Sequence, residues 1–420
     1  MRTSTLAAVV ALALPSFAVA HSGAPFGTHP FIDDGVLTGG GTDYGLLILE
    51  DGVPYWTCEE AFEFEPNWWY QSPGGPVLAG TFLGLRWSTD GGCTWSDGSG
   101  DLAEPNMAAV GFDREDSSHV FVATGEGGGV ENRLYESTNG GVGFVPTGFS
   151  QVGVKPRGVA VENGAGRLWI VAIRESDTVG LVYRSDDGGT TWSDPPLELT
   201  GWAVPEYLAL SQDAGLLYIA ARSSTGGFWL LQLDTSLAGA PVPVAEFDGQ
   251  VNAAADYGGD LHVARGWDTW LVRRDGGEDF EEQVAGPTRC LHVQDGILWG
   301  CGLDPLFPQF GWTVDGVNWT GILFYDEVVP RTCPAGSRAA DLCPPIWDRI
   351  GPNAGDDDDS ADDDDSAGDD DDDTTAADDD DSADDDGDCD CSASGRTSGG
   401  VAVLVVGLAG ALLRRRRASV

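Results

Sequence analysis

The sequence predicts an all-β chain that folds into a single β-propeller, and three observations support this fold class. A short motif of the form Ser-x-Asp-x-Gly-x-x-Trp recurs along the chain. Its acidic or Asn position falls at residues 51, 90, 139, 187, 234, 275 and 315, so neighbouring copies lie 39 to 49 residues apart. Between the copies come short runs rich in β-branched and aromatic residues, bounded by Gly, Asn and Asp, as in strands. A period in the forties with several strands per unit is typical of radially repeated sheets.

Each unit repeats the same internal order of strands. Before the motif at Asp187 come GVAVEN, GRLWIVAIRE and VGLVYRS, three segments with strand composition. The aromatic segment after the motif supplies a fourth strand, so each unit is expected to be a four-stranded antiparallel sheet. The seven copies predict seven blades. Six or eight blades stay open, because the copies at 51 and 234 are weak. The way the ring closes also stays open, since only about 30 residues precede the first copy.

The recurring motif lies where the chain must reverse direction between the third strand and the fourth. An Asp side chain can accept hydrogen bonds from backbone N–H groups just ahead of it, and the glycines can adopt positive φ. The aromatic residue can then fold back onto the sheet as an apolar lid. These roles need no substrate, so we interpret paired acids such as Asp186 and Asp187 as turn chemistry and not as a catalytic pair.

The motif resembles the Asp-box, or BNR repeat, of sialidases and other propeller proteins, with the fullest matches around Asp90 and Asp187. The resemblance covers about residues 30 to 325. It implies that the boxes are structural and lie at the blade periphery, away from any active site. The implied structural residues are Ser88, Asp90, Gly92, Trp95, Ser137, Asn139, Gly141, Phe144, Ser185, Asp187, Gly189, Trp192, Asp275, Gly277, Phe280, Asp315 and Trp319.

Enzymatic signals are weak in this sequence. Sialidases grip the substrate carboxylate with arginines, the first in an Arg-Ile-Pro motif, whereas this chain has no such motif and no arginine between the leader and Arg86. Other glycosidases on this fold use two carboxylates. Glu126 and Asp256 lie at strand ends within reach of a ligand, but loop acids of this kind are usually solvated. We predict no catalytic residue, no cofactor and no metal site.

The two ends of the chain predict export and anchoring. Residues 1–20 combine Arg2, an apolar run and Ala18-Val19-Ala20, the pattern of a secretory signal peptide. The propeller is expected over 21–350, followed by a disordered Asp-rich linker over 351–390 that cannot bury a core. A transmembrane helix is predicted over 399–413, and the arginines at 414–417 would keep its end in the cytoplasm.

The carboxyl-terminal segment over 391–420 adds a more specific expectation. DCDCSASG, the apolar stretch and the arginine cluster together resemble the MYXO-CTERM sorting signal of myxobacteria and related bacteria. The resemblance implies surface display, with a sorting protease as partner and processing or lipid attachment at Cys391, or else at Cys389. A disulfide between these two cysteines with a plain membrane anchor is the alternative. Both interpretations place the propeller outside the cell.

The six remaining cysteines suggest disulfides in an exported chain. A two-residue Asp295-Gly296 turn in CLHVQDGILWGC places Cys290 directly opposite Cys301, within bonding distance. A short loop after the propeller favours a second pair, and elimination leaves the third. The predicted disulfides are Cys290–Cys301, Cys333–Cys343 and Cys58–Cys93.

The charge of the chain excludes one class of partner. The formal net charge is −46, with 22 Lys and Arg against 68 Asp and Glu, so phosphate backbones are repelled and nucleic acid is a poor ligand. We predict a non-catalytic binding or structural module at the cell surface or outer membrane, with an extracellular glycan or protein as ligand. The alternative is an extracellular glycoside hydrolase of the Asp-box propeller type.

Overall fold

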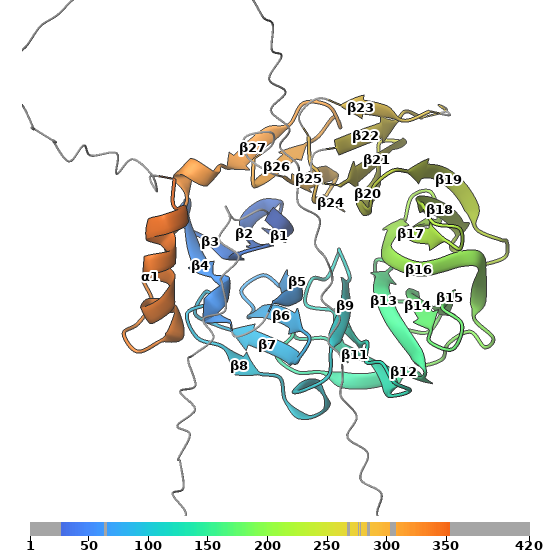
Figure 1. Ribbon diagram of the computed structural model, residues 1–420, viewed down its shortest axis with the longest axis horizontal. Coiled ribbons are helices and arrows are strands. Elements are labelled where there is room, and N and C mark those ends of the chain that lie inside the picture. The colour runs from blue at the N-terminus through green and yellow to red at the C-terminus, as the bar shows by residue number, and fades with distance from the viewer. Residues whose placement is uncertain are drawn as a thin grey trace, which may run out of the picture. The chain divides into compact units, whose positions relative to one another are not determined.

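Seven four-stranded antiparallel units, or blades, stand around a common axis (Figure 1). The computed structural model describes residues 27–352, apart from 63–64, 267–268, 276, 278, 284–285 and 303–307. Within these residues the chain is almost entirely strand, with one α-helix and three short 3-10 helices. The all-β class and the four-stranded units predicted from the repeat are confirmed.

The first three blades follow the chain without interruption. Blade 1 comprises β1 (Gly27–Asp33), β2 (Val36–Thr42), β3 (Gly45–Glu50) and β4 (Val53–Cys58). Blade 2, after the short helix η1 (Glu59–Ala61), comprises β5 (Pro66–Gln71), β6 (Val77–Thr81), β7 (Gly84–Ser88) and β8 (Ser96–Asp97). Blade 3, after η2 (Gly100–Leu102), comprises β9 (Met107–Phe112), β10 (Val120–Thr124), β11 (Glu131–Ser137) and β12 (Val145–Val152).

Blades 4 and 5 share one long strand, β16 (Leu197–Ser211). Its first part pairs with β15 as the outer strand of blade 4, and its later part pairs with β17 as the inner strand of blade 5. The two blades therefore form one continuous seven-stranded sheet. The other strands are β13 (Val154–Val161), β14 (Leu168–Arg174) and β15 (Val179–Ser185) in blade 4, and β17 (Leu216–Ser223), β18 (Phe228–Asp234) and β19 (Val242–Phe247) in blade 5.

The last two blades complete the ring. Blade 6 comprises β20 (Val251–Tyr257), β21 (Asp260–Arg265), β22 (Thr269–Arg273) and β23 (Glu281–Gln283). Blade 7 comprises β24 (Cys290–Gln294), β25 (Ile297–Cys301), β26 (Phe310–Thr313) and β27 (Thr320–Leu323). The seven inner strands β1, β5, β9, β13, β16, β20 and β24 each contact the next, and β24 contacts β1.

The core lies between neighbouring blades, where the flat faces of adjacent sheets meet. Phe121 of blade 3 and Ile170 of blade 4, for example, belong to one buried cluster and are both 0% exposed. Sheet faces packed in this way demand large apolar side chains. The side chains of each inner strand are therefore used in packing, and its free backbone edge faces the axis.

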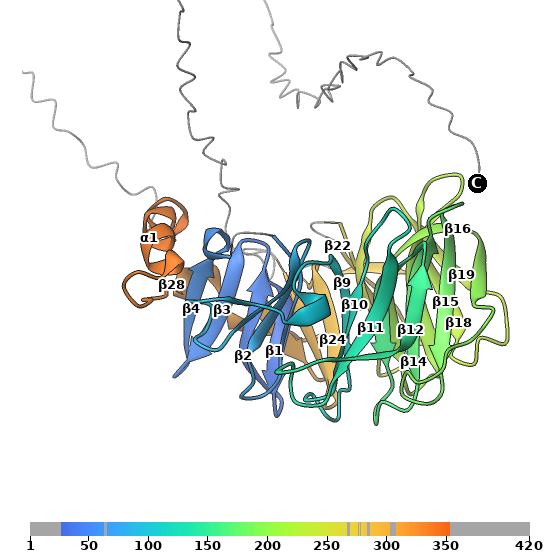
Figure 2. The same ribbon diagram turned by 90° about the horizontal axis from the view of Figure 1, so that it is seen from below.

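A segment after blade 7, here called the strap, closes the ring against blade 1. It contains η3 (Tyr325–Glu327), β28 (Val329–Pro330) and α1 (Arg338–Ile350). β28 pairs in parallel with β4, and α1 packs on the outer side of β4, where Trp347 lies 5.2 Å from Trp56 between ring centroids (Figure 2). Ser337 caps the helix by accepting the backbone N–H of Ala340 at 3.2 Å.

Two of the three predicted disulfides are wrong, and the strap explains why. The structure joins Cys58 to Cys343 and Cys93 to Cys333, with Cα atoms 5.3 and 5.4 Å apart. The segment after Cys333 is not a free loop: α1 places Cys343 on its buried face against the end of β4, where Cys58 lies. The Cys290–Cys301 pair is confirmed, since the two residues are directly opposed in register.

Several predicted features lie outside the described residues. These are the signal peptide, the Asp-rich linker beyond residue 352, Cys389, Cys391, the apolar segment at 399–413 and the arginine cluster. Among the helices that the structure describes, none has the length and apolar character to cross a membrane.

Candidate functional site

The motif turns are held closed by their own side chains, as the turn around Asp90 shows. Ser88 donates its hydroxyl to Asp90 Oδ1 at 2.8 Å and accepts the backbone N–H of Gly92 at 2.9 Å. Asp90 in turn accepts the N–H of Thr94 at 2.9 Å and its hydroxyl at 2.6 Å. Burial raises the pKa of Asp90, but the hydrogen bonds from Thr94 and Ser88 outweigh burial, and the pKa lies below its usual value.

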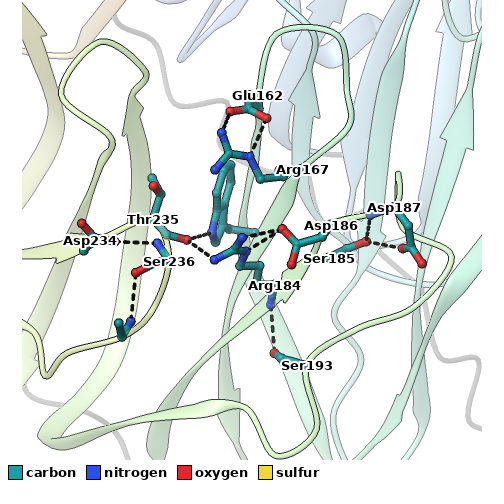
Figure 3. A network of polar contacts seen from close by, with 12 residues as sticks. Glu162, Arg167, Arg184, Ser185, Asp186, Asp187, Ser193, Asp234, Thr235 and Ser236 are labelled. Atoms are coloured by element: carbon teal, nitrogen blue, oxygen red, sulfur yellow. Dashed lines mark hydrogen bonds and ion pairs between the residues drawn. The ribbon is translucent and has the colours of Figure 1, made fainter.

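The turn in blade 4 repeats these contacts and separates the two neighbouring acids. Asp187 accepts the hydroxyl of Ser185 at 2.9 Å and the N–H of Thr191 at 2.8 Å. The backbone and hydroxyl bonds from Thr191 lower the pKa of Asp187. Asp186 faces the other way and forms an ion pair with Arg184 at 2.5 Å (Figure 3). The two carboxylates therefore have separate structural partners within blade 4.

Related contacts close the turns of blades 3 and 7. Asn139 takes the place of the acid in blade 3, where it accepts Ser137 at 2.8 Å and the N–H of Gly143 at 3.1 Å. In blade 7, Asp315 accepts the side chain of Asn318 at 2.7 Å and its N–H at 2.8 Å, which holds the pKa of Asp315 far below its usual value. Variation in the motif thus preserves an acceptor for the backbone ahead of it.

In blades 2, 3, 4, 6 and 7, the aromatic residue that follows the motif packs at the boundary with the preceding blade. Trp192 of blade 4 contacts Phe149 of blade 3 at 5.2 Å between ring centroids, and Trp319 of blade 7 contacts Trp270 of blade 6 at 5.7 Å. Trp95 and Phe280 make equivalent contacts, and Phe144 packs on the cluster between blades 2 and 3. The motif therefore fastens one blade to the next, beyond the expected lid on its own sheet.

Three of the seven motif positions depart from the predicted turn. Asp51, with φ of 52°, and Gly52, with φ of 81°, form a plain two-residue hairpin between paired Glu50 and Val53. Asp234 accepts the N–H of Ser236 at 2.7 Å in a shorter contact. At Asp275 the backbone N–H donates to Asp260 at 2.8 Å.

We predict that Asp90→Ala destabilises the fold by about 1–3 kcal/mol, because the buried hydroxyl of Ser88 and the N–H of Thr94 lose their acceptor. Guanidinium unfolding of the two chains measures the difference. Thr89→Ala changes an exposed side chain in the same turn and should be neutral. Equal stability of Asp90→Ala and the parent chain would refute a structural role for this carboxylate.

The candidate site is a pocket of about 810 Å³ at one end of the ring. Because the strands alternate in direction, the turns between first and second strands and between third and fourth strands of every blade meet at this end, which we call the hairpin face. The pocket is lined by the ends of β9, β13, β16, β20 and β24 and by the turns that follow them. Blades 3 to 7 thus build it.

The pocket wall is polar although many of its residues are apolar. β9, β13, β20 and β24 each end their sheet on the axial side, and the later part of β16 pairs mainly with β17, so backbone N–H and C=O groups without a strand partner face the axis. Small residues such as Ala160, Ala209 and Ala254 lie along this wall. The arrangement places backbone donors and acceptors between larger lining side chains such as Phe112, Tyr218 and His292.

Side chains from three blades tie the rim of the pocket together. The backbone N–H of Asn163 donates to Gln212 Oε1 at 3.0 Å, and the Gln212 amide donates to Asn163 Oδ1. Asn163 Nδ2 also donates to Glu115 at 2.9 Å. Buried Asp113 accepts the N–H groups of Glu115 at 2.9 Å and Gly164 at 2.7 Å. The turns of blades 3, 4 and 5 are therefore fixed before any ligand arrives.

Asp256 is the most perturbed carboxylate of the pocket. It is half-buried at the end of β20 and accepts the hydroxyl of Ser211 at 3.2 Å. Burial raises the pKa of Asp256; the Ser211 bond opposes this shift, and the negative charge of Asp213 adds to it. His292 lies nearby in the wall, where burial, followed by the charge of Arg114, lowers its pKa to about 3. The imidazole is therefore neutral at physiological pH.

The sequence-derived candidates fall in different places. Asp256 lines the pocket, whereas Glu126 lies at the opposite end of blade 3, where it accepts the N–H of Asn106 at 2.5 Å. Among the tryptophans outside the motifs, Trp68, Trp69 and Trp270 are buried in the contacts between blades, at 3%, 4% and 3% exposed. Sequence reasoning missed Asn163 and Gln212, although both lie within two residues of the end of the first strand of a unit, where Asp113 lies in blade 3.

A second, smaller concavity of about 330 Å³ lies at the start of β1 and β5. Asp43, Glu59 and Glu65 line it, and Asp43 is paired with Arg289. Burial raises the pKa of Glu59 to about 7, and the negative charges of Glu60, Glu65 and Asp43 add to this shift. Over the part of the chain that the structure describes, no group of three or more His, Cys, Asp or Glu is placed to bind a metal ion.

The ring of blades defines the chain as a β-propeller. Comparison with known proteins gives only distant structural similarities. No protein-family model and no curated protein matches it. Among solved structures it is similar to the extracellular domain of a hybrid two-component system from B. thetaiotaomicron, with 11% identity over 66% of this chain and 37% of that chain and a TM-score of 0.47. It is also similar to the GH74 xyloglucanase from Xanthomonas campestris, with 13% identity over 67% and 51% and a TM-score of 0.47.

A further similar structure is YCF48 bound to D1 peptide, with 17% identity over 58% of this chain and 77% of that chain and a TM-score of 0.39. The chain covers only 37% and 51% of the first two structures. The assignment to the propeller class therefore rests on the sheets and their closed ring, and these similarities assign no activity.

Proposed function

We propose that this protein is an exported, surface-held β-propeller that binds a carbohydrate in the hairpin-face pocket without transforming it. The proposal rests on the pocket wall. Strand edges, side-chain amides and hydroxyls line this cavity of about 810 Å³. Hydroxyl-rich ligands need many donors and acceptors in fixed places. The tied rim of Asn163, Gln212 and Glu115 supplies them in a preformed arrangement.

The proposed location draws on the sequence and on the disulfides. Three disulfides join the described residues, and disulfides form and persist in oxidising compartments outside the cytoplasm. This agrees with export through the proposed signal peptide. We further propose that the motif turns are of the Asp-box type and that the carboxyl-terminal segment is a MYXO-CTERM-like sorting signal. The shared Ser-to-acid and Gly-to-Ser hydrogen bonds support the first of these assignments.

A glycoside hydrolase is the second candidate, and Asp256 is the observation that favours it. A carboxyl with a raised pKa in a pocket suits a general acid, and Asp213 and Glu115 supply further carboxylates. Hydrolysis would require one of these acids to act as nucleophile or base. Binding without hydrolysis requires none of these roles.

One experiment distinguishes the two functions. The exported full chain, extracted in mild detergent, is applied to a glycan array, and every bound glycan is then incubated with it and analysed by mass spectrometry. Binding with intact glycans supports the first function. Release of shorter products that disappears in Asp256→Asn would establish the second, and an array without any bound glycan would refute both.

We predict that Ala214→Trp abolishes glycan binding and leaves stability unchanged. Ala214 is exposed in the turn after β16 and lines the pocket, so an indole there occupies the ligand's space without disturbing the core. Ala238→Trp is the matched control, because Ala238 is also exposed but does not line the pocket. Titration calorimetry with the bound glycan checks both variants, and full binding by Ala214→Trp would remove the pocket as the site.

A further inference from the structure

The hairpin face is strongly acidic. Among the described residues, the turns that meet there carry fifteen carboxylates and three arginines. The acids are Asp34, Asp51, Asp90, Asp113, Glu115, Asp116, Glu162, Asp186, Asp187, Asp194, Asp213, Asp275, Asp279, Asp295 and Asp315, and the arginines are Arg114, Arg167 and Arg274. A concave surface lined by one sign of charge concentrates ligands of the opposite sign.

Hydrogen bonding keeps several of these acids ionised. The bonds inside the motif turns lower the pKa of Asp187 and Asp315, so both are charged well below neutral pH. They accept N–H and hydroxyl groups, which are neutral, and so keep their full negative charge. The turns that hold the ring together therefore also set the electrostatic potential around the pocket.

The pocket has the same sign of charge as its surroundings. Four carboxylates line it, from Glu115, Asp213, Asp256 and Asp295, against the single guanidinium of Arg114. Asp256 is half-buried, close enough to Asp213 to feel its charge, and it accepts a hydrogen bond from the hydroxyl of Ser211. A desolvated carboxylate gains most from a cation that can approach it directly.

We infer that the ligand is a carbohydrate bearing a free amine, whose ammonium group lies beside Asp256 and Asp213. This inference rests on the proposed carbohydrate function and names the ligand class. With a neutral sugar, the hydroxyl of Ser211 and the charge of Arg273 would be left to offset the burial of Asp256 and the repulsion from Asp213, whereas an ammonium group adds a direct opposite charge. The amide rim of Asn163 and Gln212 suits the sugar hydroxyls, which favours an amino sugar over a basic peptide.

The test compares two oligosaccharides that differ only at the nitrogen. Chitosan oligomers carry free amines, and chitin oligomers of the same length carry acetamides. Titration calorimetry with the full chain in detergent should give at least about tenfold tighter binding of the amine form, the effect of one hydrogen bond to a charged group. Added salt should reduce this preference, since the surrounding charge is solvent-exposed.

Variants locate the ammonium group. Asp256→Asn and Asp213→Asn should each reduce the preference for the amine, while Asp234→Asn, on the same face but outside the pocket lining, should retain it. Asp213 is exposed, so its variant should keep the fold even if Asp256→Asn does not. A preference unchanged by both pocket variants would overturn the assigned position.

The remaining outcomes separate this inference from the proposed function. Equal affinity for both oligomers would overturn the inference and leave carbohydrate binding standing. Tighter binding of oligolysine of matched charge than of chitosan would overturn it in favour of a peptide ligand. Absence of binding to any carbohydrate would overturn the inference together with the proposed function.

Discussion

Replacing the four cysteines of the two strap disulfides, Cys58, Cys93, Cys333 and Cys343, with Ala is expected to lower the free energy of unfolding by roughly 9 kcal/mol. One loop lies inside the other, so the chain-entropy model gives about 5.5 kcal/mol for the inner loop and about 4 kcal/mol for the 285 − 240 = 45 residues that the outer bond closes in addition. The disulfides close 285 and 240 residues of chain. They fasten the strap to the outer strand of blade 1 and to the motif turn of blade 2, so their loss should open the ring between blades 7 and 1. Guanidinium unfolding measures the loss.

The third disulfide is the internal control for the strap. Cys290 and Cys301 are only 11 residues apart, so replacing both should cost about 3 kcal/mol by the same relation. Hydrogen exchange in β1 and β24 should accelerate in the strap variant alone. If the folded protein loses no more stability without the strap bonds than without Cys290–Cys301, the strap does not close the ring. Reduction of the folded parent chain repeats the measurement without mutation.

Acidification from pH 6.5 to pH 4 is expected to remove about 3 kcal/mol of stability through His262, from about 1.4 kcal/mol for each unit of pKa difference. His262 is 0% exposed and stacks on Trp270 at 5.9 Å between ring centroids. Neither ring nitrogen has a hydrogen-bond partner among the described residues.

Burial lowers the pKa of His262 to about 4, with Asp260 opposing the shift and Arg274 adding to it. His262 is therefore protonated near pH 6.5 in the unfolded chain but only near pH 4 in the folded chain. Protonation drives unfolding across this window, and above it the group has no effect on the pH dependence.

His262→Leu should remove this component and leave stability at pH 7 equal or higher, because an unpaired buried imidazole is lost. His119→Gln is the control, since His119 Nε2 already contacts Glu136 at 2.6 Å. Thermal unfolding between pH 4 and pH 8 gives the comparison. A slope in His262→Leu identical to that of the parent chain would show that His262 does not couple folding to protonation.

The sequence predicted the blades because their signal is local and repeated. The segments before Asp187 were identified as strands, and β13, β14 and β15 occupy them. The disulfide between Cys290 and Cys301 was predictable for the same reason, since a hairpin register depends on a two-residue turn. Each of these inferences needs only neighbours within one blade.

The ring closure and the site depend on residues distant in sequence. Cys58 and Cys343 are brought together by a parallel strand and a helix after the last blade, which no spacing along the chain indicates. The pocket combines the ends of five inner strands. Asn163 and Gln212 form their hydrogen bond at its rim only because the fold places blades 4 and 5 side by side. The sequence predicts that Asp256 lies at a strand end, but its partial burial in the pocket depends on how the neighbouring blades pack.

The strap has a consequence for proteolysis. A protease that cuts one exposed loop anywhere between Cys93 and Cys333 would produce two fragments that are still covalently joined, because both strap disulfides span the cut. Such a nicked molecule would migrate as one species until it is reduced, and neither piece would diffuse away. On the surface location that we propose, the two strap disulfides would keep a damaged ring assembled at the place of display.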